Sequence, residues 1–211
     1  MRSTLATLVS IFALGSAPLF AGSIPYSTPG TAITGSTTVT ASGGPITGYF
    51  VSYNAADTDV LYLVDLDTNT RVGPTFQNNA TAQGSIFNFG TYAAGTSLAF
   101  EIANESTGAT YSSDTSLSDD GSNHAYITSF AGGTLANGQG GGNVFVFPAG
   151  TYVGFEDLPI PGGDEDYNDL TFLFTNVGTR STSPVPEPSS FALLGTGLLG
   201  AAGALRRRFT R

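Results

Sequence analysis

The chain has no cysteine, no lysine and no tryptophan, and it has a single histidine, His124. Without cysteine it has neither a disulfide framework nor a thiolate nucleophile, and without lysine it cannot form a Schiff base. One imidazole and no thiolate disfavour a zinc site. No Gly-x-Ser-x-Gly elbow is present, and a glycosidase built on paired carboxylates would lack tryptophan for its sugar cleft. The sequence therefore predicts a protein without catalytic activity.

Positive charge is also scarce in the body of the chain. All 16 acidic residues lie between residues 57 and 187, where the basic residues are Arg71 and Arg180. Such a body repels nucleic-acid phosphates and anionic lipids, so we expect no nucleic-acid partner. What it offers is a binding surface for cations.

Both ends of the sequence look like targeting segments. Residues 1–21 have a basic start, an apolar run and a small residue at Ala21, which is typical of a signal peptide cleaved after that residue. Residues 189–211 contain an apolar run at 191–205 that approaches the lower limit for a membrane span. The arginines that follow this run indicate that the end stays cytoplasmic while the body crosses the inner membrane.

A linker, residues 179–188, precedes the apolar run and ends in Pro186, Glu187 and Pro188. This motif, the short apolar helix and the cluster Arg206, Arg207 and Arg208 together resemble the PEP-CTERM sorting signal of Gram-negative bacteria. The resemblance implies an exosortase as partner, transient membrane insertion through the C-terminal helix, and cleavage near the motif. The body would then be re-anchored at the cell surface or released. Proteins sorted in this way are associated with exopolysaccharide and biofilm.

Between these ends the sequence predicts one all-β domain. Residues 22–48 are rich in Ser, Thr and Gly, and we expect a loosely held lead-in with at most one strand. Over residues 49–178, short apolar or alternating runs bounded by Gly, Asn, Asp or Pro indicate a β-sandwich of jelly-roll-like type, with a mobile glycine-rich loop at 130–143. The expected strands are 48–53, 60–66, 71–76, 85–89, 97–103, 124–130, 143–147, 151–158 and 170–176.

One segment, residues 154–172, concentrates negative charge and contains no basic residue. Its oxygen-bearing side chains are those of Glu156, Asp157, Asp164, Glu165, Asp166, Asn168 and Asp169. Carboxylates this close must be solvated, protonated or neutralised by a cation. Calcium prefers six to eight hard oxygen ligands, and alternate oxygens in a tight turn can converge on it. The segment is not an EF-hand loop, because Asp169 occupies the position that requires glycine.

The alternation of side chains in the flanking strands indicates which acidic residues of this segment come together. Runs 151–158 and 170–176 are joined by a short connection, so we expect neighbouring antiparallel strands. Their ends would bring Glu156 and Asp157 close to Asp166 and Asp169. The alternative is an acidic hairpin tip that simply faces water. A second acidic stretch, residues 65–70, is predicted to be a hairpin turn rather than an ion site.

The strings "GFEDL" and "DEDYNDLTF" resemble the F-E-D…D-x-D-Y-N-D signature of an uncharacterised β-rich domain of secreted bacterial proteins, and "DDGSNHAYI" is similar to an upstream segment of that family. The resemblance spans residues 120–174. It implies calcium ligands among Glu156, Asp157, Asp164, Asp166, Asn168 and Asp169. It places Asp120 and His124 as possible neighbours behind them, although a histidine that begins a strand is more often structural.

These observations together predict a non-catalytic exported surface or extracellular-matrix protein with a calcium-stabilised β-sandwich. A calcium-dependent carbohydrate-binding module is the alternative, and an open coordination position beside an aromatic residue such as Tyr167 would favour it. A secreted glycan-active enzyme is the third possibility.

Overall fold

The computed structural model describes residues 24–136 and 144–179, and every regular element within these ranges is a β-strand. The chain divides into two compact units, Met1–Thr179 and Arg180–Arg211, and the described residues belong to the first. The predicted signal peptide, sorting motif, arginine cluster and apolar helix lie outside the described residues. Within the described ranges, no helix has the length and apolarity to cross a membrane.

The strands follow one another with short turns, as the alternation of apolar runs and Gly, Asn or Asp predicts. In chain order they are β1 (Val39–Ala41), β2 (Gly44–Tyr53), β3 (Asp59–Asp65), β4 (Thr70–Thr75), β5 (Ile86–Tyr92), β6 (Ser97–Asn104), β7 (Thr110–Ser112), β8 (Ala125–Phe130), β9 (Gly133–Ala136), β10 (Val144–Phe147), β11 (Gly150–Phe155), β12 (Leu170–Thr175) and β13 (Val177–Thr179).

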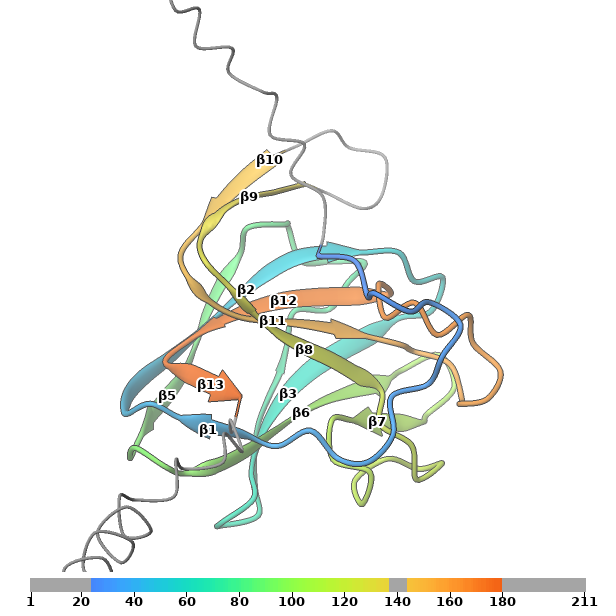
Figure 1. Ribbon diagram of the computed structural model, residues 1–211, viewed down its shortest axis with the longest axis horizontal. Coiled ribbons are helices and arrows are strands. Elements are labelled where there is room, and N and C mark those ends of the chain that lie inside the picture. The colour runs from blue at the N-terminus through green and yellow to red at the C-terminus, as the bar shows by residue number, and fades with distance from the viewer. Residues whose placement is uncertain (1–23, 137–143, 180–211) are drawn as a thin grey trace, which may run out of the picture. The chain divides into compact units, whose positions relative to one another are not determined.

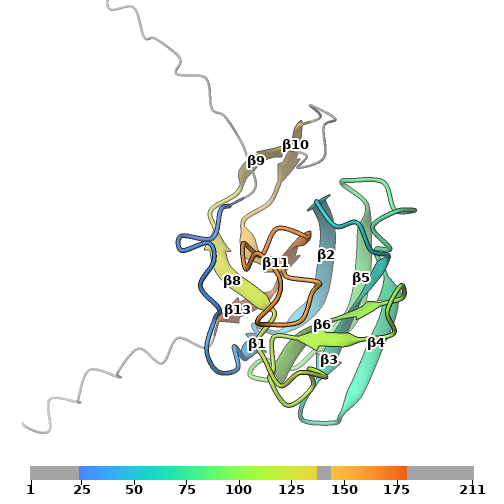
Figure 2. The same ribbon diagram turned by 90° about the vertical axis from the view of Figure 1, so that its right-hand side faces the viewer.

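Two antiparallel sheets form the body of the fold (Figures 1 and 2). One has the order β13-β1-β6-β3-β4, with β7 also paired to β6, and the other has the order β5-β2-β12-β11-β8. Their inward side chains make one continuous apolar core, to which Leu61, Phe100 and Ile102 come from the first sheet and Phe50, Phe155 and Phe172 from the second. The prediction of an all-β sandwich is confirmed.

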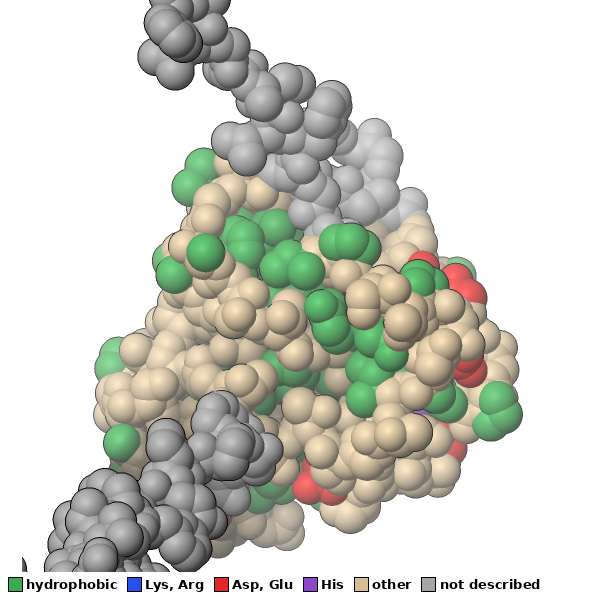
Figure 3. All heavy atoms as spheres, viewed as in Figure 1, with side chains coloured by type: hydrophobic (Ala, Val, Ile, Leu, Met, Phe, Trp, Pro, Cys, Tyr) green, Lys and Arg blue, Asp and Glu red, His purple; other side chains and the backbone are tan. Residues whose placement is uncertain are grey.

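The second sheet is apolar on its outer face as well. Val51, Tyr152 and Leu173 point away from the main core and pack with Leu135 of β9 and Phe147 of β10. β9 and β10 pair with each other as a separate two-stranded ribbon. Figure 3 shows hydrophobic side chains gathered on the face that is also seen in Figure 1. This second cluster explains why β12 is buried on both sides, with only its last residue partly exposed.

Two expected boundaries differ from those of the structure. The one strand expected within the lead-in 22–48 is present as β1, but it pairs with both β13 and β6, and the first residues of β2 also fall in this range, so the sandwich begins before residue 49. Backbone pairing holds these Ser-, Thr- and Gly-rich residues, although their composition is that of a loop. The loop expected at 130–143 contains β9, which pairs with β10. Residues 137–143 lie outside the described ranges.

Candidate functional site

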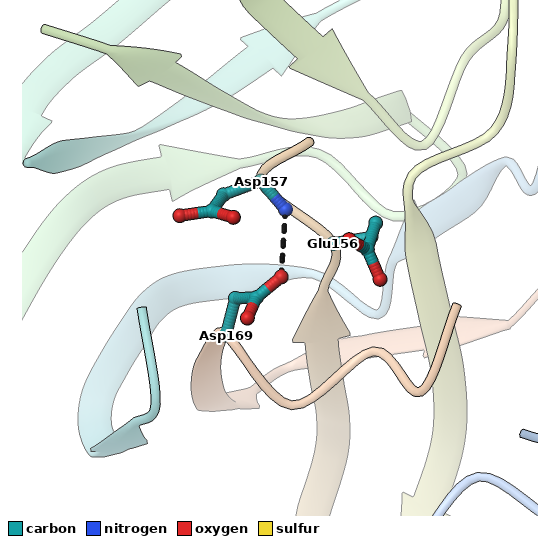
Figure 4. Close-up of side chains that lie close together, drawn as sticks. All are labelled: Glu156, Asp157 and Asp169. Carbon is teal, nitrogen blue, oxygen red and sulfur yellow. Dashed lines mark hydrogen bonds between the residues drawn. The ribbon is translucent and has the colours of Figure 1, made fainter. Parts of the chain in front are cut away.

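The acidic segment lies where β11 ends and β12 begins. β11 and β12 pair antiparallel with Phe155 opposite Leu170, so the prediction that they are neighbours is confirmed. Glu156 and Asp157 follow directly after β11, and Asp169 directly precedes β12. The backbone N–H of Asp157 donates to Asp169 Oδ2 over 2.9 Å (Figure 4). The pairing of the two strands therefore places three carboxyl groups at one end of the sheet.

These three groups form an inner cluster, defined here as Glu156, Asp157 and Asp169. Each offers one carboxylate oxygen that lies within 4.8 Å of those of the other two. The exposed fraction is 1% for Glu156 and 4% for Asp157. Neither oxygen of Glu156, nor Asp157 Oδ2, has a hydrogen-bond partner among the described residues. Burying a polar atom without a partner costs about 1–3 kcal/mol, and more when it is charged.

A second group, the outer cluster, consists of Glu156, Asp164 and Asp166, again with one oxygen each within 4.8 Å of the others. The loop is folded by its own side chains, because Asp164 Oδ1 accepts from the N–H of Asp166 over 3.3 Å and Asp166 Oδ1 accepts from that of Asn168 over 3.1 Å. Asp166 is partly buried and Asp164 is exposed. The carboxylate oxygens of the alternate residues Asp164 and Asp166 therefore lie close to each other and to Glu156.

Asn168 contributes to the loop through its side-chain amide, and Glu165 through its backbone conformation. The Asn168 amide nitrogen donates to Asp166 Oδ2, and its Oδ1 is buried without a hydrogen-bond partner among the described residues. Glu165 adopts a left-handed backbone conformation, with φ of 53°, as does Tyr167, with φ of 55°. Such conformations are uncommon for residues other than glycine, and here they alternate with the residues that carry the converging oxygens.

Burial dominates the electrostatics of both clusters. Loss of solvent, followed by repulsion from Asp164 and Asp157, raises the pKa of Glu156 to about 7. Loss of solvent and repulsion from Asp157 raise the pKa of Asp169 to about 9. Burial also raises the pKa of Asp157 and of Asp166. Without a cation, part of this site would hold protons at neutral pH.

Sequence analysis missed one buried acid, Asp59, which begins β3 on the opposite sheet. It is fully buried, and neither of its carboxylate oxygens has a hydrogen-bond donor among the described residues. Burial, followed by repulsion from Asp157, raises the pKa of Asp59 to about 8. The pleat of β3 places Asp59 on the inward face with Leu61 and Leu63, so the period of two could have identified it as a buried acid.

His124 and Asp120 lie beside the acidic segment and support its backbone. His124 is fully buried, with Nδ1 3.0 Å from the backbone oxygen of Glu156 and Nε2 2.9 Å from Asp120 Oδ2. Asp120 also accepts from the backbone N–H of Ile160 over 2.9 Å. Burial opposes ionisation of Asp120, but the hydrogen bonds from Ile160, Ser122 and His124 lower its pKa overall. Both residues therefore tie the loop to β8 and do not extend the clusters.

Tyr167 and the acidic stretch 65–70, both considered in the sequence, make contacts that stabilise the fold. Tyr167 is 2% exposed, its ring packs on that of Tyr26 with centroids 4.8 Å apart, and its hydroxyl accepts from the N–H of Ile33. Asp65 Oδ1 accepts from the backbone N–H groups of Asp67 and Thr68 in the turn between β3 and β4. The prediction of a hairpin turn at residues 65–70 is confirmed.

The chemistry that this arrangement offers is the binding of a hard cation. Its ligand atoms are carboxylate and amide oxygens, which suit calcium, and both oxygens of Glu156, Asp157 Oδ2 and Asn168 Oδ1 are buried without protein donors among the described residues. Arg71, the one arginine of the described residues, pairs with Glu101. No described cationic side chain forms an ion pair with either cluster.

Comparison with known proteins gives two matches. The PEP-CTERM protein-sorting motif matches residues 184–208, which contain the proline–glutamate–proline motif and the three-arginine cluster. This motif indicates an exported protein that an exosortase processes and that is sorted to the cell envelope. No curated protein matches the chain. The family described as "Domain of unknown function (DUF4114)" matches residues 66–176, just over half of the 211 residues. The chain therefore belongs to the DUF4114 family.

Proposed function

We propose that this protein is a non-catalytic component of the bacterial surface or extracellular matrix, and that calcium stabilises its β-sandwich at the end of β11 and β12. The observation that carries the proposal is the inner cluster, in which both carboxylate oxygens of Glu156 and Oδ2 of Asp157 are buried without a hydrogen-bond partner among the described residues. A cation is the missing partner that their chemistry fits.

The energetic argument rests on repulsion and desolvation. Two like charges about 4 Å apart repel by roughly 1 kcal/mol even with the full screening of water, and by more when they are partly buried. A cation that binds the folded chain converts this repulsion into attraction. The unfolded chain cannot hold the carboxylates of Glu156, Asp157 and Asp169 together, so the binding energy stabilises the fold.

Calcium fits this set of ligands better than its rivals. Zinc prefers imidazole and thiolate ligands, and the chain has one histidine and no cysteine. His124 also has both ring nitrogens directed at oxygen atoms of Asp120 and Glu156. Magnesium demands octahedral geometry and gives up water reluctantly, which suits a buried cluster poorly.

Calcium titration by differential scanning calorimetry tests the proposal, on the full-length chain solubilised in detergent and stripped with a chelator. At a hundredfold excess of calcium over the dissociation constant we expect about 2.7 kcal/mol of stabilisation. For a chain of this size that raises the melting temperature by about 5–10 °C. Magnesium should raise it less.

The variants of this experiment are matched in chemistry. Asp169→Asn should remove most of the calcium-dependent shift, because it deletes a charge from the inner cluster. Asp67→Asn changes an exposed acid in the β3–β4 turn and should leave the shift intact. A melting temperature indifferent to millimolar calcium would leave the segment as an acidic tip without a metal.

We further propose that the exported protein acts at the surface through association with exopolysaccharide. The sorting motif supports delivery to the envelope. The chain has 16 acidic residues and few basic ones, so its surface attracts cations. This composition supports a role for calcium in linking the protein to other anionic material. Cosedimentation of the mature protein with the host's extracted polysaccharide, with and without calcium, tests this association.

A calcium-dependent carbohydrate-binding module is the second candidate. Asp164 is exposed, so a cation held beside it would keep coordination positions open to solvent or to sugar hydroxyls. Tyr167, however, is buried against Tyr26 and cannot stack on a sugar ring there. A glycan array probed in calcium and in chelator separates the candidates, because a purely structural ion gives no calcium-dependent glycan signal.

A further inference from the structure

We infer that the acidic segment holds two calcium ions rather than one, and that Glu156 bridges them. The inference rests on the proposed function and deepens it. The inner ion would lie among Glu156, Asp157 and Asp169, and the outer ion among Glu156, Asp164 and Asp166. Both groups satisfy the same spacing, with ligand atoms within 4.8 Å of one another.

Glu156 is the residue that the two clusters share. It is 1% exposed, and both of its carboxylate oxygens lack a hydrogen-bond partner among the described residues. A single calcium ion can bind both oxygens of one carboxylate, so the two unpartnered oxygens alone do not give the number of ions. Glu156, however, belongs to two clusters whose other members differ, and an ionised carboxylate offers lone pairs on both oxygens, so this carboxylate can bridge two ions.

The acidic loop lies directly against this carboxylate. A Cβ placed on Gly163 would lie 1.9 Å from Glu156 Oε1, so the loop backbone approaches Glu156 too closely for a residue with a side chain. Asp164 and Asp166 follow at once, so their oxygens come to the same side chain. Asn168 supplies another buried oxygen, Oδ1, without a partner among the described residues.

Charge balance also favours two ions. The two clusters together contain five carboxyl groups, those of Glu156, Asp157, Asp164, Asp166 and Asp169. When all five are ionised, one divalent cation leaves three negative charges uncompensated. Two divalent cations leave one negative charge uncompensated. Arg71, the arginine within the described residues, pairs with Glu101 and is not available to them.

The two ions should differ in affinity and in the rate at which they exchange with solvent. The inner ligands Asp157 and Asp169 are fixed at the paired ends of two strands and are joined by a backbone hydrogen bond of 2.9 Å. The outer ligands belong to a loop, and Asp164 is exposed. We therefore expect the outer ion to bind more weakly and to exchange faster, which would let this loop respond to the calcium concentration outside the cell.

Calcium binding by isothermal titration to the chelator-stripped full-length chain tests the inference. We expect two ions for each wild-type chain and one for Asp164→Asn. That variant should keep most of the calcium-dependent rise in melting temperature, because its inner cluster is untouched. Glu156→Gln should weaken binding of both ions at least tenfold, and Asp67→Asn is the control that should still bind two.

The outcomes separate this inference from the proposed function. One ion in the wild-type chain, with a melting shift that depends on Asp169, would overturn the bridge and leave the structural calcium site standing. Two ions in Asp164→Asn would also overturn it. No bound calcium would remove both proposals. If Glu156→Gln fails to fold, as judged by circular dichroism, the exposed Asp164→Asn substitution still decides the number of ions.

Discussion

The carboxylate of Glu156 occupies the space in which a side chain on Gly163 would begin, since a Cβ built there would lie 1.9 Å from Oε1 and 2.5 Å from the carboxyl carbon. Glycine at residue 163 therefore lets the acidic loop close over the end of β11.

The first prediction follows from this contact. Gly163→Ala should displace the Glu156 carboxylate and weaken calcium binding by tenfold or more, which corresponds to about 1.4 kcal/mol. The metal-free fold should change little, because the atoms in the way belong to the end of a flexible side chain. Titration calorimetry measures the effect. The control is Gly178→Ala, where a Cβ would have no heavy atom within 4 Å. Equal affinities in the two variants would contradict the contact between residue 163 and the Glu156 carboxylate.

The second prediction concerns pH. The folded state raises the pKa of Glu156 to about 7, of Asp59 to about 8 and of Asp169 to about 9, from ordinary values near 4. These groups hold protons more tightly when folded, so the stability that they contribute is complete below pH 4 and is lost as the pH rises to about 9.

Urea unfolding of the metal-free chain at pH 5, 7 and 9 measures this dependence. We expect the free energy of unfolding to fall from pH 5 to pH 9, and calcium to restore more of it at pH 9 than at pH 5. A metal-free chain that gains stability over this range would show that these acids are not buried together.

The third prediction concerns Asp59. Asp59→Asn removes a carboxyl group that is fully buried beside Asp157, so it should stabilise the metal-free chain at pH 9. If one pKa unit of the shift is realised as stability, the gain is about 1.4 kcal/mol and a few degrees in melting temperature. The same substitution at exposed Asp67 should have no such effect. A lower melting temperature for Asp59→Asn at pH 9 without calcium would mean that Asp59 has a stabilising partner.

The fourth prediction concerns His124, whose ring lies 4.2 Å from that of Tyr111, between centroids, and contacts Asp120 and the backbone of Glu156. His124→Ala would leave a cavity and remove the ring's contacts with the Glu156 backbone oxygen and the Asp120 carboxyl group, so we expect a loss of about 2–4 kcal/mol with or without calcium. Urea unfolding measures it. His124→Gln, which keeps a donor, should lose less. If the loss appeared only in calcium, His124 would be acting on the ion rather than on the fold.

The fifth prediction concerns catalysis and processing. With one histidine, no cysteine and no lysine, we expect no turnover of common polysaccharides, and we expect the mature protein to lack residues 191–211. A substrate screen measures the first, and intact mass of protein from the native host measures the second. Turnover abolished by Asp157→Asn in a folded protein would make it an enzyme. Retention of Arg211 would contradict processing at the sorting motif.

Much of this molecule follows from local sequence. The period of two in runs such as residues 60–66 and 170–176 determines strands, because alternate side chains of a strand point to opposite faces. The meeting of Asp157 with Asp169 could be predicted because β11 and β12 are joined by a short connection. The sorting motif is a linear signal and needs no fold to be recognised.

The tertiary structure decided the rest. Asp59 meets Asp157 across the two sheets, and Tyr167 is buried under Tyr26 of a lead-in that composition alone assigns to a loop. β1 exists because β6 and β13 lie beside it. These contacts join residues far apart in the chain, and local pattern carries no information on which distant segments pair. Whether an acid faces water or a core depends on that pairing, so only the folded chain determines which carboxylates are buried without a partner.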